Sequence, residues 1–252
     1  MARIFITGSA DGLGQLAASA LITQGHQVVL HARNEKRAQE ALGKVPGAET
    51  VLTADLSNIE ETKQLAAKVN ALGNFDAVIH NAGVYQAPAE EILTVNTLAP
   101  YILTSLIERP RRLIYLSSGM HLGGNAKLES LHTKASRITY SDSKLHVLML
   151  CLAVARRWPG VYANAVDPGW VPTKMGGASA PDDLQKGYET QVWLAVSKET
   201  KAKVSGRYFH HQREHRHNSE ADDVHLQEKL LTLCEEITGV VFPVSSSLFA
   251  PL

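Results

Sequence analysis

A glycine-rich turn near the N-terminus is the feature that most constrains this chain. It reads Thr7-Gly8-Ser9-Ala10-Asp11-Gly12-Leu13-Gly14, between a β-branched run at 4–7 and an apolar helical pattern at 13–24. Glycines in such a turn let a pyrophosphate approach the backbone, and the next helix offers free N–H groups and its positive dipole end. Because strand, glycine spacing and helix occur together, the motif predicts dinucleotide binding rather than a structural turn alone.

The rest of the chain alternates short apolar runs with helical patterns. We expect further strands at 28–30, 50–54, 77–79, 113–116 and 161–166, and helices at 34–43, 58–72, 89–106, 140–157, 184–197 and 224–237. This alternation predicts an α/β fold, a doubly wound (Rossmann) parallel sheet with helices on both faces. We expect a single domain over 1–252, with 1–110 mainly binding the dinucleotide and 111–252 carrying the catalytic and substrate-binding half.

Charge and composition exclude several classes of function. The 25 basic and 25 acidic residues cancel, so no overall field attracts nucleic acid. No apolar run approaches the ~20 residues that span a bilayer, and no signal segment opens the chain. Cys151 and Cys234 lie in apolar helical patterns, which predicts buried free thiols. We expect a cytoplasmic protein without a nucleic-acid or membrane partner.

Tyr140 and Lys144, in Tyr-Ser-Asp-Ser-Lys, are a candidate catalytic pair. Four residues apart on a helix, their side chains share one face. A nearby ammonium favours the phenolate and lowers the pKa of a phenol, which suits acid-base catalysis near neutral pH. The same spacing also arises by chance in many helices.

Ser117 and Ser118 follow the strand predicted at 113–116. Ligands of open α/β sheets bind beyond the carboxyl ends of the strands, where a serine hydroxyl can hydrogen-bond a substrate carbonyl oxygen. The alternative is a serine that caps a turn or helix.

These motifs occur in the order that the short-chain dehydrogenase/reductase family uses, and from Ala2 to Gly169 the chain resembles that family. Asn96, in Thr-Val-Asn-Thr, resembles the helix asparagine that completes the family's catalytic tetrad. The resemblance therefore implies a catalytic set of Asn96, Ser118, Tyr140 and Lys144. Ser118 is preferred to Ser117 because the second serine of such a pair is catalytic in the family.

The same resemblance implies which residues bind the cofactor. Asn81-Ala82-Gly83 resembles the family motif under the cofactor, Asp55-Leu56 the residues that meet the adenine, and Asp167–Thr173 the segment that holds the nicotinamide amide. The implied cofactor-binding residues are Gly8, Ser9, Asp11, Gly12, Leu13, Gly14, Arg33, Asp55, Leu56, Asn81, Ala82, Gly83, Tyr140, Lys144, Pro168, Gly169, Val171 and Thr173.

The end of the second strand bears on the choice of cofactor. It reads Leu30-His31-Ala32-Arg33-Asn34 and holds no carboxylate to grip the ribose of NAD. A guanidinium at Arg33 suits a 2′-phosphate, although a solvated arginine at a helix start is the alternative. Asp11 in the glycine-rich turn, where many NADP users carry a cation, argues the other way. NADP(H) is favoured, with NAD(H) as the alternative.

The resemblance implies an oxidoreductase that moves a hydride between a nicotinamide cofactor and a small-molecule carbonyl or secondary alcohol. In the reducing direction Tyr140 would donate a proton, Ser118 would hold the substrate oxygen, and Asn96 would hold a water that links Lys144 to solvent. Met120, Trp170 and Met175 favour a lipophilic ketone or aldehyde. The alternatives are a non-catalytic dinucleotide sensor on the same fold and a sugar-nucleotide epimerase or dehydratase, whose glycine spacing differs.

Outside these motifs the sequence supports further expectations. Ser205–Phe209 resembles the retinol-dehydrogenase-like branch of the family, and residues 120–138 and 172–183 are expected as loops over the site, the second mobile. His121 either faces the substrate or is a plain loop residue. The five histidines at 210, 211, 215, 217 and 225 predict a solvated segment and no metal site. The helices around Asn96 and Tyr140 predict a homodimer or homotetramer, with Leu145, Leu148, Met149 and Leu152 as apolar surface.

Overall fold

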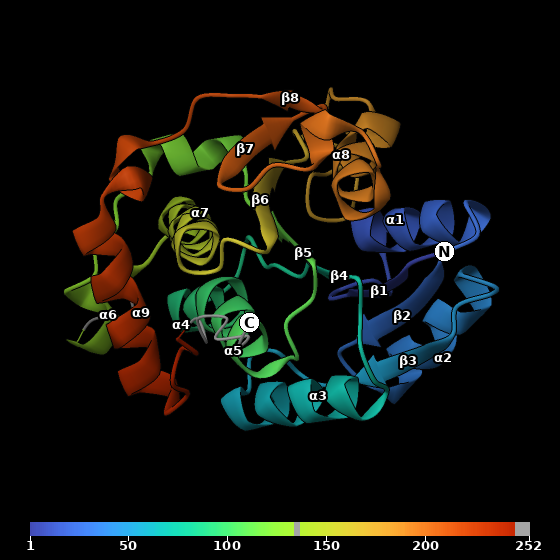
Figure 1. The fold of residues 1–252 in the computed structure, drawn as a ribbon, viewed down its shortest axis with the longest axis horizontal. Coiled ribbons are helices and arrows are strands. Elements are labelled where there is room, and N and C mark those ends of the chain that lie inside the picture. Colours follow the sequence, from blue (N-terminus) through green and yellow to red (C-terminus); the bar gives the residue numbers. More distant parts are fainter. Residues whose placement is uncertain (134–136, 245–252) are drawn as a thin grey trace, which may run out of the picture.

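A computed structural model describes residues 1–133 and 137–244. Within them one sheet of eight strands has the order β3-β2-β1-β4-β5-β6-β7-β8 (Figure 1). All neighbours are parallel except β7 and β8, which are antiparallel. The strands are β1 Arg3–Ile6, β2 Gln27–Ala32, β3 Thr50–Thr53, β4 Ala77–His80, β5 Arg112–Leu116, β6 Tyr162–Asp167, β7 Arg207–His210 and β8 Arg213–Glu214. The strand order reverses between β1 and β4, where such sheets bind ligands.

Helices cover both faces of the sheet (Figure 1). One buried apolar cluster joins the sheet to α1 Gly12–Thr23, α2 Glu35–Lys44 and α8 Leu184–Val196. A second cluster joins the other face to α3 Ile59–Ala71, α5 Ala99–Leu106, α7 Tyr140–Arg157 and α9 Val224–Thr238. Two short helices are α4 Ala89–Leu93 and α6 Ser130–Thr133. The doubly wound α/β prediction is confirmed, and no helix in the described ranges is long and apolar enough to cross a membrane.

Local capping signals placed several helix ends correctly. The Asn34 side chain accepts a hydrogen bond from Arg37 N, and Asn58 accepts from Glu60 N and Glu61 N, so both asparagines cap helices as predicted. Thr139 caps α7, and Asp142 returns the bond in a capping box. The active-site helix therefore begins at Tyr140, as its sequence indicates.

The predicted helix over 89–106 is interrupted. Between α4 and α5 the backbone makes a π-helical turn at Thr94–Leu98, with Asn96 inside it. Such turns shift the helical register and are frequent at functional sites. The prediction of one regular helix is therefore wrong in its middle turn.

The last two strands, β7 and β8, were not predicted from the sequence. β7 pairs with β6, and β8 turns back on β7 across His211 and Gln212. A strand of four residues and an edge strand of two carry too little alternation to be recognised. The segment predicted as a solvated loop is therefore partly a hairpin.

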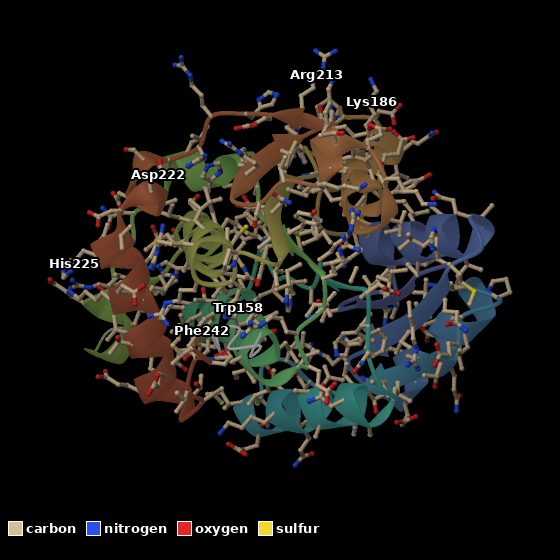
Figure 2. The ribbon with its side chains drawn as sticks, viewed as in Figure 1. Trp158, Lys186, Arg213, Asp222, His225 and Phe242 are labelled. Carbon is tan, nitrogen blue, oxygen red and sulfur yellow. The ribbon has the colours of Figure 1, made fainter. Side chains whose placement is uncertain are left out.

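The apolar side of α7 is buried within this chain. Leu145, Leu148 and Met149 are fully buried, and Leu152 is nearly so. α9 packs along α7, and Trp158 at the end of α7 stacks on Phe242, with ring centroids 5.1 Å apart (Figure 2). A dimer or tetramer would therefore need a different surface from the one the sequence suggested. Cys151 and Cys234 are free and buried, as predicted.

Candidate active site

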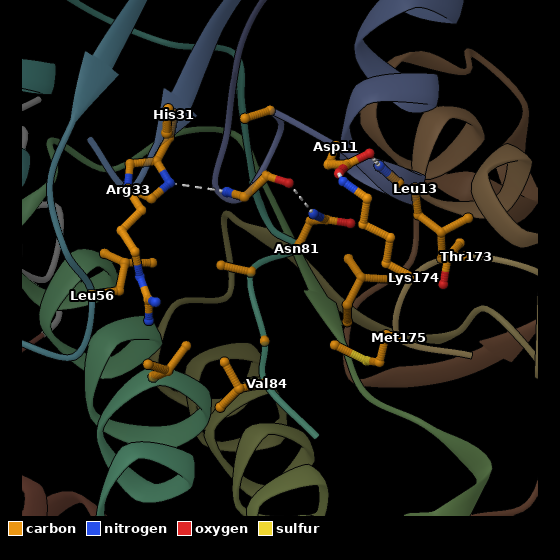
Figure 3. Close-up of a pocket in the computed structure, with 18 of the residues that line it drawn as sticks. Asp11, Leu13, His31, Arg33, Leu56, Asn81, Val84, Thr173, Lys174 and Met175 are labelled. Atoms are coloured by element: carbon orange, nitrogen blue, oxygen red, sulfur yellow. Dashed lines mark hydrogen bonds and ion pairs between the residues drawn. The ribbon is translucent and has the colours of Figure 1, made fainter. Parts of the chain in front are cut away.

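A pocket of about 410 Å³ opens at the carboxyl ends of β1, β2 and β4. Figure 3 shows His31, Arg33 and Leu56 on one side of it and Asp11, Leu13, Thr173 and Lys174 on the other. The sequence-predicted residues that line it are Gly8, Asp11, Gly12, Leu13, Arg33, Asp55, Leu56, Asn81, Ala82, Gly83, Tyr140, Lys144, Pro168 and Thr173.

The glycine-rich turn is shaped by close backbone contacts. Gly8 has a φ of +63°, and a Cβ there would lie 2.8 Å from Ala82 Cα. A Cβ on Gly14 would lie 2.4 Å from Asn81 Nδ2 and 2.6 Å from Gly8 O. Asn81 Nδ2 donates to Thr7 O and Gly8 O, which ties the turn to the end of β4. The absence of a side chain at Gly14 therefore allows close packing against Asn81 and Gly8. An anionic group is expected at the start of α1.

Ser9 belongs to the turn but not to the pocket wall. Its hydroxyl is fully buried, donates to Ile6 O and accepts from His31 N. The sequence reading had missed His31, whose Nδ1 accepts from Gly8 N at 3.0 Å while its Nε2 donates to Ala54 O. Burial lowers the pKa of His31 to about 4, so the ring is neutral and keeps this acceptor near neutral pH. A buried neutral histidine thus supports the glycine-rich turn.

Arg33 lines the pocket beside two carboxylates. Its NH2 group is 2.9 Å from Glu91 Oε1, and its Nε is 3.4 Å from Asp55 Oδ1. The sequence indicated no acid at the end of β2, and tertiary packing brings these two from other elements. Arg37 also lines the pocket and was missed; it is 3.2 Å from Asp11 Oδ2. Two guanidinium groups therefore border the β2 side of the pocket.

Asp11 pairs with a cation from the far end of the chain. Lys174, after β6, hydrogen-bonds the Asp11 carboxylate across the pocket (Figure 3). This hydrogen bond, opposed by burial and aided by Gly12 N and Arg37, lowers the pKa of Asp11 to about 2. The glycine-rich turn has no lysine or arginine of its own, but the fold supplies two.

The Tyr140 side chain lies at the inner end of the pocket. Its ring meets the Tyr85 ring edge-on, with ring centroids 4.8 Å apart, and the Ser118 hydroxyl is near enough to influence its pKa. Burial raises the pKa of Tyr140 to about 12; the Ser118 bond opposes this, and Asp167 and Tyr85 add to it. The expected lowering of this pKa by Lys144 is not found, because desolvation of the phenolate dominates and Lys144 is not among the groups that shift it. Tyr140 is therefore a protonated phenol.

Lys144 is buried on the same face of α7. Its Nζ donates to Leu116 O at 2.8 Å, and burial lowers its pKa to about 8, with Asp167 opposing the shift. Ser117 donates from its hydroxyl to the main-chain oxygen of Lys144. Ser117 thus anchors α7 to β5 and also lines the pocket, and the preference for Ser118 as the catalytic serine stays a prediction.

The Asn96 side chain lies near Lys144 and already makes three hydrogen bonds to other groups. Its Oδ1 accepts from Val84 N, and its Nδ2 donates to Val84 O and Ser143 Oγ. A Cβ added to Gly83 would lie 3.2 Å from Lys144 Nζ and 3.3 Å from Asn96 Oδ1. Only glycine leaves space between these groups, so the π turn and Gly83 together shape the inner wall.

Ser118 takes the capping role that the sequence had offered as an alternative. Its side chain caps the 3₁₀ turn Gly119–Gly123 by accepting from Met120 N, and its hydroxyl opposes the rise in the pKa of Tyr140; Ser117, not Ser118, is among the residues that line the pocket. His121 in that turn does not face the pocket. It is buried, with Nδ1 2.6 Å from Ser118 O and Nε2 accepting from Asn218 N. His121 thus fixes the backbone of Ser118 by a hydrogen bond to its main-chain oxygen.

The segment after β6 closes the other wall. Pro168 and Thr173 line the pocket, Val171 is buried, and Gly169 takes a φ of +80°. Thr173 Oγ1 accepts from Gly176 N. The 172–183 segment, expected to be mobile, is folded on itself through bonds such as Trp170 Nε1 to Gly176 O.

Five large apolar side chains are exposed in segments that leave the carboxyl end of the sheet; of these, Tyr85 contacts Tyr140 and Met175 lines the pocket. They follow the ends of β4, β5 and β6 and retain about two-fifths or more of their surface; they are Tyr85, Met120, Leu122, Trp170 and Met175. A protein surface rarely leaves such side chains grouped at a pocket without a ligand to cover them.

Known proteins resemble this chain in sequence. A family model for short chain dehydrogenase matches residues 2–112. An uncharacterized oxidoreductase of Emericella nidulans is 47% identical, covering 96% of this chain and 99% of its own length. Short-chain dehydrogenase chyC of Penicillium rubens is 41% identical, over 96% of this chain and 100% of its own length. Retinol dehydrogenase 14 of Homo sapiens is 27% identical, covering 94% of this chain and 86% of its own length.

A solved structure has the same fold. An uncharacterized protein from Mycobacterium Paratuberculosis superposes with a TM-score of 0.82 at 24% identity, covering 97% of this chain and 96% of its own. The relatives share the full length of the chain, including the part beyond the matched family model. The chain belongs to the short-chain dehydrogenase family of oxidoreductases.

Proposed function

We propose that this protein is an NADPH-dependent reductase of lipophilic ketones or aldehydes, with Tyr140 as its proton donor. The observation that carries the proposal is that a largely desolvated, protonated Tyr140 and Lys144 both line the pocket that contains the glycine-rich turn. A buried phenol with a pKa near 12 is set to give up a proton only as negative charge develops on a substrate oxygen.

The chain's own groups suit a dinucleotide. Gly8 and Gly12 line the pocket at the start of α1, which is where a pyrophosphate would lie, and a Cβ at Gly8 would force Ala82 in the opposite wall to move. A bound nicotinamide would supply the hydride. Lys144 would bind the nicotinamide ribose, and Thr173 and the backbone near Val171 would hold the amide.

The remaining residues would act on the substrate. Ser118 would hold the carbonyl oxygen, and Tyr140 would donate the proton to it. Asn96 keeps one lone pair of Oδ1 toward the space between Gly83 and Lys144, where a water would return a proton to the lysine. Exposed Tyr85 against Tyr140 and exposed Met175 in the pocket wall support a lipophilic substrate, because covering those side chains removes apolar surface from water.

The preference for NADPH rests on Arg33 and Arg37, which border the β2 side of the pocket. A 2′-phosphate there would accept paired N–H donors from a guanidinium. Asp55 and Glu91 compete for Arg33, and Asp11 competes for Arg37.

The assembly proposed from the sequence is a homodimer or homotetramer. Light scattering, which measures the mass of the protein in solution, checks this proposal.

The test measures NADPH consumption, by its absorbance, across a panel of apolar ketones and aldehydes. Tyr140→Phe keeps the ring contact with Tyr85 and removes only the hydroxyl, so we expect kcat to fall by roughly 10²–10⁴-fold while NADPH affinity changes little. Tyr162→Phe is the matched control, because it removes the same hydroxyl from a tyrosine at the start of β6, outside the pocket lining. Turnover by Tyr140→Phe close to that of the native enzyme rejects the assignment. Cofactor binding with no turnover of any carbonyl favours the sensor instead.

A further inference from the structure

A second cavity, of about 450 Å³, lies between α8 and the β7–β8 hairpin, away from the dinucleotide pocket. We call it the basic pocket; it is lined by Lys186, Glu189 and Thr190 of α8 and by His210, His211, Gln212, Arg213 and His215. Figure 2 shows Arg213 and Lys186 close together at the edge of the molecule where these elements meet. None of its residues lines the proposed active site.

The basic pocket has an excess of unpaired positive charge. Lys186 and Arg213 form no ion pair with any residue in the described ranges, whereas Arg156, Arg157 and Arg207 elsewhere each have one. Glu189 is the one acid in the lining. Asp182 and Asp183 act on His211 and Lys186 from outside the lining, but no carboxylate in the described ranges forms an ion pair with Lys186 or Arg213, which leaves the cavity attractive to an anion.

The three histidines add hydrogen-bonding groups to the same cavity. The His210 and His211 rings stack with centroids 3.7 Å apart, and the His215 ring is 5.3 Å from that of His210. His211 Nε2 is buried and has no hydrogen-bond partner among the described residues. Buried polar atoms of native proteins nearly always have a partner, so this nitrogen points to a ligand.

The backbone of the turn between β7 and β8, which carries His211, is strained. His211 and Gln212 have φ values of +47° and +60°, a conformation that side chains other than glycine rarely adopt. Gln212 N donates to Thr190 Oγ1 at 3.0 Å, which pins the turn to α8. Strained, fixed backbone of this kind is common at ligand sites.

A metal ion does not fit the same groups. No set of three or more His, Cys, Asp or Glu side chains in the described part of the chain converges as metal ligands. Stacked imidazoles cannot both aim a nitrogen at one ion, and two neighbouring cations would repel it.

We propose that the basic pocket binds the phosphate group of a small molecule, at a site separate from the dinucleotide pocket. Lys186 approaches from the helix, Arg213 from the edge strand, and the imidazoles from the hairpin turn. Donors on several sides suit a tetrahedral oxyanion with three or more acceptor oxygens, and arginine and lysine are the usual phosphate ligands.

The basic pocket adjoins the active-site wall through one residue. His210 Nδ1 lies 3.2 Å from Asp167 O and 3.5 Å from Asp167 Oδ2. On its other side, the Asp167 carboxylate lies close to Gly119, next to Ser118. Phosphate binding at the hairpin therefore has a short physical path to the residues around Tyr140.

The test titrates inorganic phosphate into the full-length protein and follows the imidazole signals of assigned histidines by NMR at constant pH. We expect saturable shifts at His210, His211 and His215 with little change at His225, which lies outside the basic pocket. In Lys186→Ala/Arg213→Ala, phosphate should bind at least tenfold more weakly, because each charge-assisted contact is worth roughly that much. This readout is independent of turnover, so it stands apart from the reductase proposal.

Two further variants make the result decisive. Lys198→Ala/Arg216→Ala removes the same charge from exposed positions outside the basic pocket and should leave the affinity unchanged. Arg33→Ala should leave the His211 response intact, because Arg33 lines the other pocket. Arg213→Gln, on the exposed edge strand, substitutes if the double variant does not fold. The proposal is overturned if His211 shows no saturable response, or if both double variants weaken binding equally.

Discussion

The Nζ atom of Lys144 lies 5.4 Å from the centroid of the Tyr140 ring, one turn further along α7. Burial affects the two groups in opposite directions: it raises the pKa of Tyr140 and lowers that of Lys144. Both shifts favour the uncharged form, so the buried pair is least costly when both side chains are neutral. A ligand that brings charge into the pocket would change this balance.

Lys144 should titrate near pH 8 in the free protein. Its ammonium is present below that pH and lost above it, whereas ordinary lysines lose theirs near ~10.4. The measurement is a pH titration of ¹³Cε-labelled lysines by NMR. One signal should have a midpoint near 8 and be missing from the spectrum of Lys144→Met. If every lysine titrates above pH 10, the burial of Lys144 is wrongly described.

Arg33→Ala should weaken NADPH binding far more than NADH binding. A charge-assisted contact with phosphate is worth roughly 1.5–3 kcal/mol, and NADH lacks the phosphate. Because Glu91 holds Arg33, Glu91→Gln should do the reverse and tighten NADPH alone. Dissociation constants for both cofactors with each variant provide the check. Equal losses for the two cofactors in Arg33→Ala would show that Arg33 does not meet the 2′-phosphate.

Asp142 should be the largest single electrostatic contributor to the start of α7. Its buried carboxylate accepts hydrogen bonds from Lys127 Nζ, Asn125 N and both Thr139 donors. Because Lys127 is partly exposed, the loss is mainly that of a buried acceptor with several donors, so Asp142→Ala should lower the free energy of unfolding by about 1–3 kcal/mol. Denaturant unfolding measures it, with the exposed Glu108→Ala as a control expected to stay within about 0.5 kcal/mol.

The Asp142 effect should also depend on pH. Burial opposes its ionisation, but the hydrogen bonds from Lys127, Asn125 and Thr139 outweigh burial and lower its pKa. A depressed carboxyl pKa stabilises the fold above the unfolded value of about 3.9 and ceases to do so as the pH falls through the folded one. The stability gap between native protein and Asp142→Ala should therefore narrow below about pH 4. A gap that widens in acid would contradict this assignment.

Residues 174–185 should exchange their amide hydrogens more slowly when NADP and a substrate analogue are both bound. The segment joins the glycine-rich turn through Lys174 and Asp11 and otherwise folds largely on itself, so it has few contacts that prevent opening. Closure over the pocket would add contacts and exclude water. Hydrogen exchange of the free protein, the NADP complex and the ternary complex gives the comparison. Slow exchange already in the free protein, unchanged by ligands, would make this segment a fixed wall.

Local sequence determined the parts of this protein that depend on neighbouring residues. The strand, glycine-rich turn and helix at 4–24, the caps at Asn34 and Asn58, and the shared face of Tyr140 and Lys144 were all predicted and lie as expected. Backbone sterics, capping bonds and helical spacing act over a few residues, so the sequence shows them directly.

Only the tertiary structure decided which distant groups meet and how deeply they are buried. Asp11 meets Lys174, 163 residues away in the chain, and Arg33 meets Glu91. Ser117 binds the α7 backbone whereas Ser118 caps the following 3₁₀ turn, a difference between neighbours that only the fold shows. The raised pKa of Tyr140 follows from desolvation, which no i, i+4 spacing can report. Ion pairs and burial depend on packing between elements, and packing exists only once the sheet and its helices have assembled.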